Sequence, residues 1–473
     1  MATVSTDTGH NSSMIDTNWA LGQPEKRADW GWRAMHGSVV LGKKLTAAYY
    51  GKHIQYSYFS GCSTGGRQGL REIQGFPDSF DGVLVGAPAW WASRLYNWVL
   101  RVGAANLPAF SPSHVPLSFI PTLAAEVHRQ CDTVDGVADG IISAPELCSL
   151  DLATLLCRPG SSNTTCLSHP QLSTIDAMYN DYLSPSTGEL LHPGLTFGSE
   201  ALWGMLLGGG VEPSPYGTGW ARHFLLEDSS FDWNALSSNP SPSSNYSHTH
   251  SSLLTLSDKL NPASANANDF LAMKPFRARG GKLVMYHGLS DGLVPHRGSE
   301  LFVREAARAL GHTLTRTSRT KTGAGTDTQG QGQGHGHSES HTESNIEGDA
   351  RGIRDFLRLF LVPGMQHCGL TTPDVNAPWC FGGATHAAAM GIGEWSVPAH
   401  KDARHDVLLG LIGWAEKGNP VEEVVATTWW DMRNASSGVR RQRVLCPWPA
   451  RARYDGVGDV DVAGSWRCED FED

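Results

Sequence analysis

Apolar and polar positions change their spacing several times along the first ninety residues. Residues 28–50 repeat apolar side chains at about every 3.6 positions, which predicts a helix. Residues 54–60 are rich in aromatic side chains that favour extended backbone, and residues 81–87 form a short apolar run typical of a fully buried strand. The residues between the two strands, from Arg67 to Ile73, suit a second helix. Alternating helices and strands predict a parallel sheet.

The same alternation returns in the last two hundred residues. Apolar runs at 281–288 and 356–362 predict two further buried strands, and residues 299–310 and 402–416 predict helices. A Trp-rich segment ends the chain. We therefore expect an α/β fold, in which a mostly parallel sheet is built from both ends of the chain.

Residues from about 90 to 270 have a different texture, with frequent Pro, Ser and Asn and weak periodicity. This predicts an inserted domain, placed where it could cover the strand ends as a lid. The expected organisation is a first core part at 1–90, a lid at 91–272 and a second core part at 273–473. Residues 318–348 are rich in Gly, Gln, Ser, Thr and His, so we expect a disordered surface loop there.

Composition narrows the range of partners. The 473 residues carry a net charge of -10, which argues against nucleic acid or an anionic membrane surface as a partner. No apolar run approaches the length of a membrane span. The oligomeric state stays open.

Cysteine usage predicts an oxidising compartment. Among the nine Cys, closely spaced pairs typical of local disulfide loops are Cys131 and Cys148, Cys157 and Cys166, and Cys446 and Cys468. Asn-x-Ser/Thr sequons fit a secreted glycoprotein. They begin at Asn11, Asn163, Asn245 and Asn434. The first residues lack the pattern of a signal peptide, so we expect that the chain begins inside a larger secreted protein.

The pentad Gly61-Cys62-Ser63-Thr64-Gly65 fits the nucleophile-elbow pattern Gly-x-Ser-x-Gly. In that motif a strained turn from strand to helix raises the serine hydroxyl above the sheet, where a base and a substrate can reach it. The predicted strand before Ser63 and the predicted helix after it favour this interpretation over an ordinary glycine-rich turn.

A nucleophilic serine needs an imidazole to take its proton and a carboxylate to orient the imidazole. In the α/β-hydrolase arrangement these residues follow sheet strands in the chain order Ser, Asp, His, and the order of Ser63, Asp291 and His367 matches. The weaker candidates are Asp269 and Asp374 for the acid, and His287 and His296 for the base. We therefore predict a triad of Ser63, Asp291 and His367.

Two cysteines stand directly beside this predicted triad. Cys62 precedes Ser63 and Cys368 follows His367. If the serine and the histidine are within hydrogen-bonding reach, the two sulfur atoms should be close enough to bond. Such a disulfide would clamp the nucleophile loop to the base loop.

Residues 131–148 hold a second group of chemically notable side chains. Asp132, Asp135 and Asp139 fall within eight residues, and their charges would repel one another without a cation. A hard ion with oxygen ligands, most plausibly calcium, would relieve this repulsion. The spacing is not that of an EF-hand, so a cluster of ordinary Asp-Gly turns is the alternative.

The Cys-Ser and His-Cys pairs resemble those of the tannase and feruloyl esterase family, in particular its secreted fungal members. The likeness covers most of the chain. It includes Thr-Asp-Thr-Gly-His at 6–10, Tyr-Phe-Ser-Gly-Cys-Ser-Thr-Gly-Gly-Arg-Gln-Gly at 58–69, Phe-Asp-Gly at 80–82 and His-Gly-Leu-Ser-Asp at 287–291.

This resemblance implies a serine carboxylesterase with an α/β-hydrolase core and a large lid. It carries the triad onto Ser63, Asp291 and His367, and the disulfide clamp onto Cys62 and Cys368. It also implies a structural calcium in the lid, held by the aspartates named above with the carbonyls of Val137 and Ile141. The expected disulfides, which leave Cys380 unpaired, are Cys62–Cys368, Cys131–Cys148, Cys157–Cys166 and Cys446–Cys468.

The expected activity is hydrolysis of aromatic acid esters through an acyl-enzyme, with the Thr64 amide as an oxyanion donor and no organic cofactor. A feruloyl ester of plant cell-wall polysaccharide is the first choice of substrate, and a galloyl ester (tannin) is the alternative. Family members carry a longer segment before residues 6–10, with early strands and a second oxyanion donor. A further alternative is therefore an inert fragment with an unpaired sheet edge, low solubility and little activity.

Overall fold

The computed structural model describes residues 2–159, 166–208, 210–236, 249–311, 352–391, 395–431 and 434–470. The segment predicted to be disordered, 318–348, lies outside the described residues, and so do the sequons at Asn163 and Asn245.

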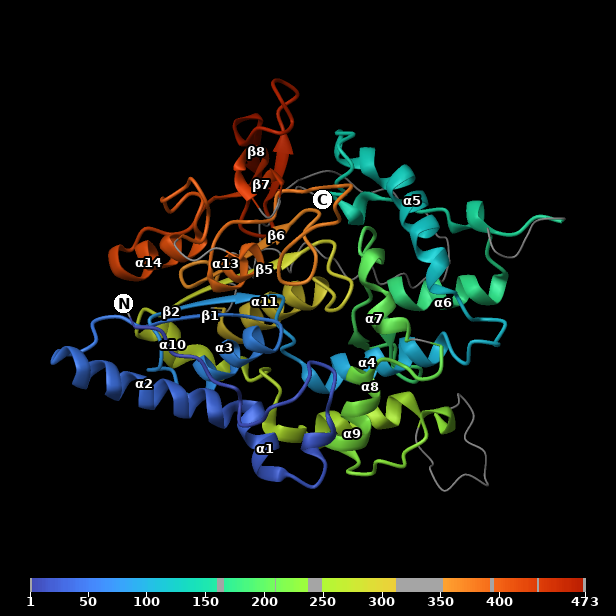
Figure 1. Cartoon of the computed structure of the whole chain (residues 1–473), viewed down its shortest axis with the longest axis horizontal. Helices are drawn as coiled ribbons and strands as arrows, with labels where there is room; N and C mark the ends of the chain where they lie inside the picture. Colours follow the sequence, from blue (N-terminus) through green and yellow to red (C-terminus); the bar gives the residue numbers. More distant parts are fainter. Residues whose placement is uncertain are drawn as a thin grey trace, which may run out of the picture.

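A four-stranded parallel sheet forms the centre of the core, with its strands in the order β1-β2-β5-β6 (Figure 1). The strands are β1 (Tyr58–Cys62), β2 (Gly82–Gly86), β5 (Lys282–Gly288) and β6 (Leu357–Val362). The inner strands β2 and β5 are buried almost throughout, as their continuous apolar runs predicted. The α/β-hydrolase-like class expected from the sequence is confirmed.

Each strand contributes to two cores, because successive side chains point to opposite faces of a sheet. Val83 and Met285 pack in one apolar cluster, whereas Leu84 and Val284 pack in another. The first cluster contains residues of α3 (Thr64–Gly75), α10 (Lys274–Ala278) and α11 (Arg297–Leu310), with α2 (Ala34–Tyr50) at its border. The second contains residues of α14 (Val407–Lys417), α13 (Ala384–Met390) and the strand β7 (Val424–Asp431). The sheet is therefore covered on both faces.

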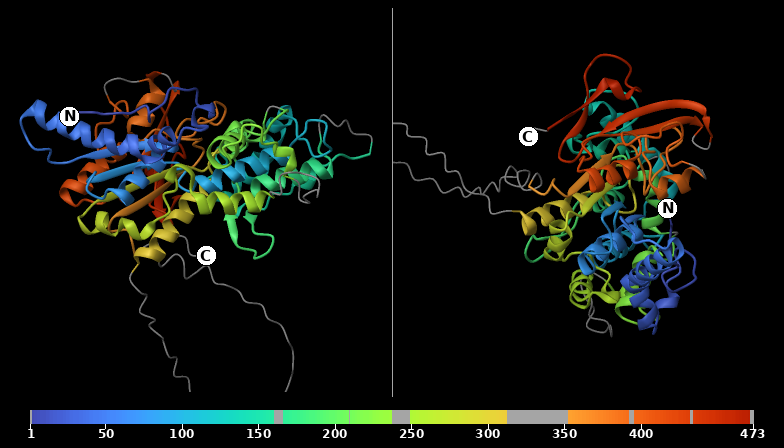
Figure 2. Two further views of the ribbon diagram at one scale, coloured as in Figure 1. Left: turned by 90° about the horizontal axis from the view of Figure 1, so that it is seen from below. Right: turned by 90° about the vertical axis from the view of Figure 1, so that its left-hand side faces the viewer.

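The inserted region is mainly helical and has an apolar core of its own. It lies to one side of the sheet in Figures 1 and 2. Its elements are α4 (Ala92–Ala105), α5 (Ile120–Cys131), α6 (His169–Tyr179), β3 (Tyr182–Leu183), β4 (Leu190–His192), α7 (Gly204–Leu207), α8 (Pro215–Gly219) and α9 (His250–Leu260), with short 3-10 and π turns between them. The boundaries predicted for this lid, 91 and 272, stay a prediction.

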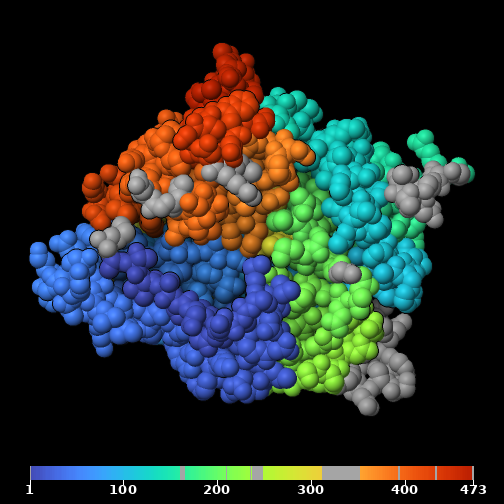
Figure 3. All heavy atoms as spheres, in the orientation of Figure 1, coloured from blue at the N-terminus to red at the C-terminus, as the bar shows by residue number. Residues whose placement is uncertain are grey.

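Several bonds fasten the lid to the core, and two of them lie close to the end of β5. Thr196 Oγ1 donates a hydrogen bond to the carbonyl of Leu289 at 3.2 Å, and Arg297 forms two bonds to the carboxylate of Asp181 at 2.5 and 3.0 Å. The N-terminal segment, blue in Figure 3, contacts the lid from another side through Thr17 and His223. The lid is thus bonded to the loop that follows β5.

Several element boundaries differ from those expected. The first strand begins at Tyr58 rather than 54, and the first helical region begins earlier, with α1 (Pro24–Ala28) and a π turn at Asp29–Arg33 before α2. The last helix begins at Val407 rather than 402, because Asp406 accepts the N–H groups of the first turn and caps it there. The C-terminal sheets were not predicted. They are β7 paired with β8 (Asn434–Leu445), and β9 (Arg451–Tyr454) paired with β10 (Trp466–Glu469).

The expected open sheet edge and exposed apolar surface are present in the described part of the chain. Strand β1 is an edge strand, and α2 exposes 61% of Leu45 and 83% of Tyr49. Whether this surface lowers solubility stays a prediction. Among the described residues, no helix combines the length and apolar character needed to cross a bilayer.

Gly66 offers a test of how tightly α3 packs on the sheet. A Cβ atom at Gly66 would lie 2.6 Å from the carbonyl oxygen of Gly86, so we expect Gly66→Ala to lower the free energy of unfolding by about 1–3 kcal/mol, the usual cost of overpacking. The matched control is Gly65→Ala, where a Cβ would meet nothing within 4 Å and a helical position favours Ala. Thermal unfolding measures both. Equal melting temperatures for the two variants would contradict the close approach.

Candidate active site

Ser63 occupies the strained turn between β1 and α3. Its backbone has φ 61° and ψ -120°, a conformation that residues other than glycine rarely adopt. Ser63 N donates to the carbonyl of Gly86 at 2.9 Å, and Ala89 N donates to the carbonyl of Ser63 at 3.3 Å. A side chain at Gly61 would come within 2.9 Å of Gly65, so this turn requires a glycine there. The elbow geometry predicted from the pentad is present.

The Asp291 carboxylate accepts four hydrogen bonds and is 1% exposed. Oδ1 accepts the N–H groups of Leu293 and Val294 at 2.9 and 3.0 Å. Oδ2 lies 2.6 Å from His367 Nδ1 and 3.1 Å from His287 Nε2. Burial alone would raise the pKa of Asp291, but the charge of His367 and the bonds from both imidazoles outweigh it and hold this pKa well below its usual range.

The loops that follow β5 and β6 lie against each other. Leu289 N donates to the carbonyl of Val362, and Ser290 N donates to the carbonyl of Met365. At Gly288 a Cβ atom would lie only 2.1 Å from the Met365 carbonyl oxygen. The acid and base loops therefore approach closely, and glycine at 288 permits this contact.

Cys62 and Cys368 form a disulfide with a Cα–Cα distance of 5.9 Å. Among the described residues neither Ser63 Oγ nor His367 Nε2 has a hydrogen-bond partner, although the disulfide joins their chain neighbours. Such contacts are often long before substrate binds.

The remaining cysteines also follow the predicted pairing. The further disulfides are Cys131–Cys148, Cys157–Cys166 and Cys446–Cys468. Each of these bridges closes a short local loop, with 17, 9 and 22 residues of separation respectively. Cys380 is buried and unpaired. All four predicted disulfides are thus confirmed.

The histidines near Asp291 differ in whether they can accept a proton from Ser63. His287 is 1% exposed, and both of its ring nitrogens are engaged, Nδ1 with Ser299 Oγ at 2.8 Å and Nε2 with Asp291 and the carbonyl of Val294. His296 instead places Nδ1 against Glu300 at 3.0 Å. The geometry therefore favours His367 as the base. The contact of His287 with Asp291 was missed in the sequence, where the spacing of four residues gave a weak signal.

Two other predicted residues also have defined places. Thr64 is the first residue of α3, so its N–H group has no acceptor within the helix. Asp269, a weaker candidate for the acid, caps a 3-10 turn by accepting the Ala272 N–H at 3.2 Å. That bond gives Asp269 a local structural role.

The aspartates of the 131–148 loop share a hydrogen-bonding pattern. Asp132, Asp135 and Asp139 each accept one backbone N–H through Oδ1. The donors are the N–H groups of Gly140, Val137 and Ile141, at 2.8, 3.0 and 3.0 Å respectively. These bonds orient the three carboxylates.

The Oδ2 atoms of these aspartates are only partly available to bind a cation. Asp135 Oδ2 is buried and has no hydrogen-bond partner among the described residues, an arrangement that a hard cation would relieve. Asp139 Oδ2 is already paired with Arg443 at 2.6 Å, and both side chains are nearly inaccessible. The three carboxylates do not bring their ligand atoms within 4.8 Å of one another, so only the Asp135 oxygen meets the need of a hard cation, while Arg443 supplies positive charge at Asp139.

Within the described part of the chain, a trio elsewhere brings its potential metal ligands within 4.8 Å of one another, namely His400, Asp402 and His405. The two imidazole rings are stacked, with centroids 3.9 Å apart and planes 14° apart. An ion bound to imidazole lies close to the ring plane at about 2.1 Å from nitrogen, and two parallel planes this far apart cannot share one. His405 Nδ1 bonds the Asp402 carboxylate at 2.9 Å instead.

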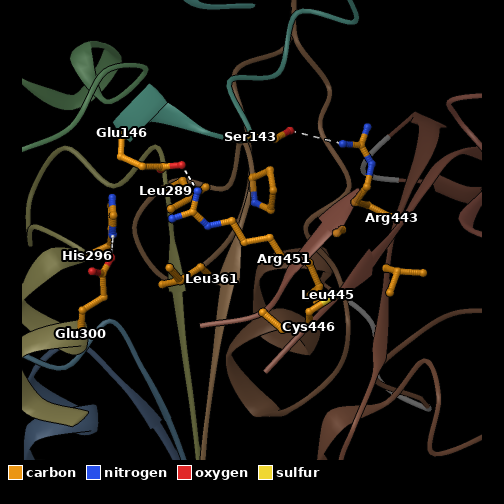
Figure 4. A pocket seen from close by; sticks show the side chains of 14 residues that line it. Ser143, Glu146, Leu289, His296, Glu300, Leu361, Arg443, Leu445, Cys446 and Arg451 are labelled. Carbon is orange, nitrogen blue, oxygen red and sulfur yellow. Dashed lines mark hydrogen bonds and ion pairs between the residues drawn. The ribbon is translucent and has the colours of Figure 1, made fainter. Parts of the chain in front are cut away.

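A small pocket of about 40 Å³ lies where the lid, the acid loop and the C-terminal strands meet (Figure 4). Its walls include Glu146, which is ion-paired with Arg451, and His296, which is bonded to Glu300. A cavity of this size holds a few water molecules, whereas ligand pockets measure roughly 300–1,000 Å³. None of the triad residues lines it, so it is not the substrate site.

The family model for tannase and feruloyl esterase matches residues 1–469. The chain is 29% identical to a probable feruloyl esterase B-2 of Aspergillus terreus, over 99% of this chain and 75% of that protein. It is 28% identical to feruloyl esterase B of Aspergillus niger, over 99% of this chain and 76% of that protein.

Solved structures agree with the family match. The crystal structure of feruloyl esterase B from Aspergillus oryzae superposes with a TM-score of 0.74 at 26% identity, covering 98% of this chain and 78% of that one. A tannin acyl hydrolase from Aspergillus niger shares the fold, with a TM-score of 0.63 at 20% identity over 94% of this chain and 70% of that one. The chain belongs to the tannase and feruloyl esterase family, and it is a carboxylic ester hydrolase.

Proposed function

We propose that this chain hydrolyses esters of aromatic acids through an acyl-enzyme. The observation that carries the proposal is the 2.6 Å bond between Asp291 and His367, next to a disulfide that joins the neighbours of His367 and Ser63. Asp291 holds the imidazole with Nδ1–H toward the carboxylate, which leaves Nε2 to take a proton.

In the first half-reaction, Ser63 Oγ bonds to the ester carbonyl carbon and its proton passes to His367 Nε2. The Thr64 N–H group donates to the oxyanion that forms. The bond from carbon to the alcohol oxygen then breaks, and the alcohol leaves with the proton from His367. In the second half-reaction, water attacks the acyl-serine by the same steps and releases the acid and Ser63.

For the substrate we propose a feruloyl ester of plant cell-wall polysaccharide, with galloyl esters as the second candidate. The named feruloyl esterase relatives support the first, and the shared fold with a tannin acyl hydrolase keeps the second open. No organic cofactor takes part in the proposed reaction.

We further propose that the protein acts outside the cell as a glycoprotein. Four disulfides support an oxidising compartment. The two sequon asparagines within the described residues, Asn11 and Asn434, are both exposed, as attachment of a glycan requires.

Calcium in the 131–148 loop is also part of the proposal. The buried and unpartnered oxygen of Asp135 supports it. Asp132 and Asp139 are the further carboxylate ligands proposed, and Asp139 Oδ2 would exchange its bond to Arg443 for the ion. The carbonyls of Val137 and Ile141 would complete the shell. The ion would stabilise the lid, because oxygen ligands from several turns would be held together.

Ser63→Ala should abolish ester hydrolysis. Removing the hydroxyl that forms the acyl-enzyme costs roughly 10³- to 10⁶-fold in kcat, while the melting temperature should not change. The assay uses methyl ferulate and methyl gallate with the same protein, and faster turnover of the ferulate is expected. Ser60→Ala, a variant three residues earlier on β1, is the control and should remain active.

Retention of a tenth of the wild-type rate by Ser63→Ala would exclude the acyl-enzyme mechanism. Faster turnover of the gallate would assign the second substrate class, and no turnover of either ester by the wild type would favour the inert alternative.

The disulfide between Cys62 and Cys368 should matter for rate more than a bridge elsewhere. Replacing both residues by Ala frees the base loop from the nucleophile loop, and a displacement of about 1 Å in such a site costs on the order of 100-fold in kcat. The control is the double Ala variant of Cys446 and Cys468, which should keep its kcat within about twofold while losing stability. Similar kcat values for the two double variants would argue against a positioning role.

Chelation of calcium should lower the melting temperature, and addition of calcium should restore it. An ion that binds only the native state stabilises it by about 2.7 kcal/mol at a hundred times its Kd. Asp135→Asn should remove this response, whereas Asp402→Asn, a change at an exposed carboxylate outside the loop, should keep it. A wild-type melting temperature that ignores both chelator and calcium would count against the site.

A further inference from the structure

Asp291 receives hydrogen bonds from two imidazoles, whereas the proposed mechanism uses one. Its two oxygens offer about four acceptor positions, and four donors fill them. Two are the backbone N–H groups of Leu293 and Val294 on Oδ1, and two are the imidazoles of His367 and His287 on Oδ2. No position is left for water, so the carboxylate cannot turn without breaking one of these bonds.

The surroundings of His287 fix its tautomer. Nε2 faces two acceptors, the carboxylate of Asp291 at 3.1 Å and the carbonyl of Val294 at 2.9 Å, so Nε2 must carry a proton. Nδ1 faces the Ser299 hydroxyl at 2.8 Å and accepts its hydrogen. Burial lowers the pKa of His287. The side chain is therefore a neutral donor.

We propose that His287 is a positioning residue of this esterase, which holds Asp291 Oδ2 toward His367 and shares the negative charge of that oxygen. The proposal rests on the proposed function. His287 acts through Asp291, because its ring nitrogens are both engaged and it does not face the reacting atoms.

Sharing of the oxygen has a consequence for the base. A hydrogen bond from a neutral donor stabilises the carboxylate, so less of its charge is available to favour the imidazolium of His367. Loss of the His287 donor should therefore favour the protonated form of His367. The other titratable groups nearby are His296, which is paired with Glu300, and His386, whose pKa is lowered to about 3 by burial so that it stays neutral.

Two substitutions of similar length separate the donor from the volume it fills. His287→Met removes the N–H group, and His287→Gln keeps an amide N–H near the position of Nε2. We expect His287→Met to lower kcat by about 10- to 100-fold, the usual worth of a hydrogen bond to a charged group, with KM little changed. We also expect the midpoint of the acid limb in the pH profile of kcat/KM to move to a higher pH, by roughly half a pH unit. His287→Gln should bring both kcat and the midpoint of the acid limb most of the way back to the wild-type values.

The matched control is His296→Gln, a change at a buried histidine just before α11 that contacts Glu300 instead of Asp291. The midpoint of the acid limb of this variant should stay at the wild-type pH. If His287→Met lowers kcat with an unmoved or lowered acid limb, or if His287→Gln rescues nothing, His287 merely supports packing and the proposal is wrong.

A measurement without substrate tests the proposal even if His287→Met does not fold. In wild-type protein labelled with 15N-histidine, the correlation spectrum should show His287 protonated at Nε2, identified by loss of its signals in His287→Gln. Protonation at Nδ1 alone would overturn the proposal although the enzyme is active. Full activity of Ser63→Ala would instead overturn the proposed function and leave the tautomer result standing.

Discussion

A carboxylate removed from water keeps its charge only if donors replace the lost solvent, and this constraint governs the architecture around Asp291. Two donors come from the turn that follows β5, one from the end of β5 itself and one from the loop after β6. All four must be in place at once, so the turn that carries the acid, the end of β5 and the loop after β6 form one unit. The bond from Thr196 to the Leu289 carbonyl fastens the lid to the same unit.

The order of the strands in the sheet imposes a second constraint on the chain. Ser63 follows β1 and His367 follows β6, and these are the two outer strands of the four-stranded sheet. Neighbouring strands lie about 4.8 Å apart, so the two strand ends are separated by roughly 14 Å. The Cα atoms of Cys62 and Cys368 are nevertheless 5.9 Å apart. The loop after β6 must therefore cross the ends of β5 and β2, and the disulfide holds it in that crossing position.

The sequence was informative where one local pattern determines one local structure. The buried runs at 82–86 and 282–288 could be read as strands because a parallel sheet covered on both faces admits little but apolar side chains. The elbow could be read from its glycines. The hairpin of β7 and β8 was missed although its pairing is local, because its Val, Thr and Trp residues were read only as a Trp-rich segment. The role of His287 was missed for a different reason, since its partners Asp291, Val294 and Ser299 come together only when the turn after β5 has folded.

The same fold serves feruloyl esterases and a tannin acyl hydrolase, so the sheet and the elbow cannot by themselves select the acyl group. Selection has to come from side chains that touch the substrate. The inserted region is in direct contact with the residues that follow Asp291. A side chain at Gly292, directly after Asp291, would come within 2.3 Å of the Ser199 carbonyl oxygen of the lid, and Arg297, at the start of the next helix, binds Asp181. A lid substitution that shifts these contacts would therefore also shift the turn that holds the acid, so the inserted region and the position of Asp291 depend on each other.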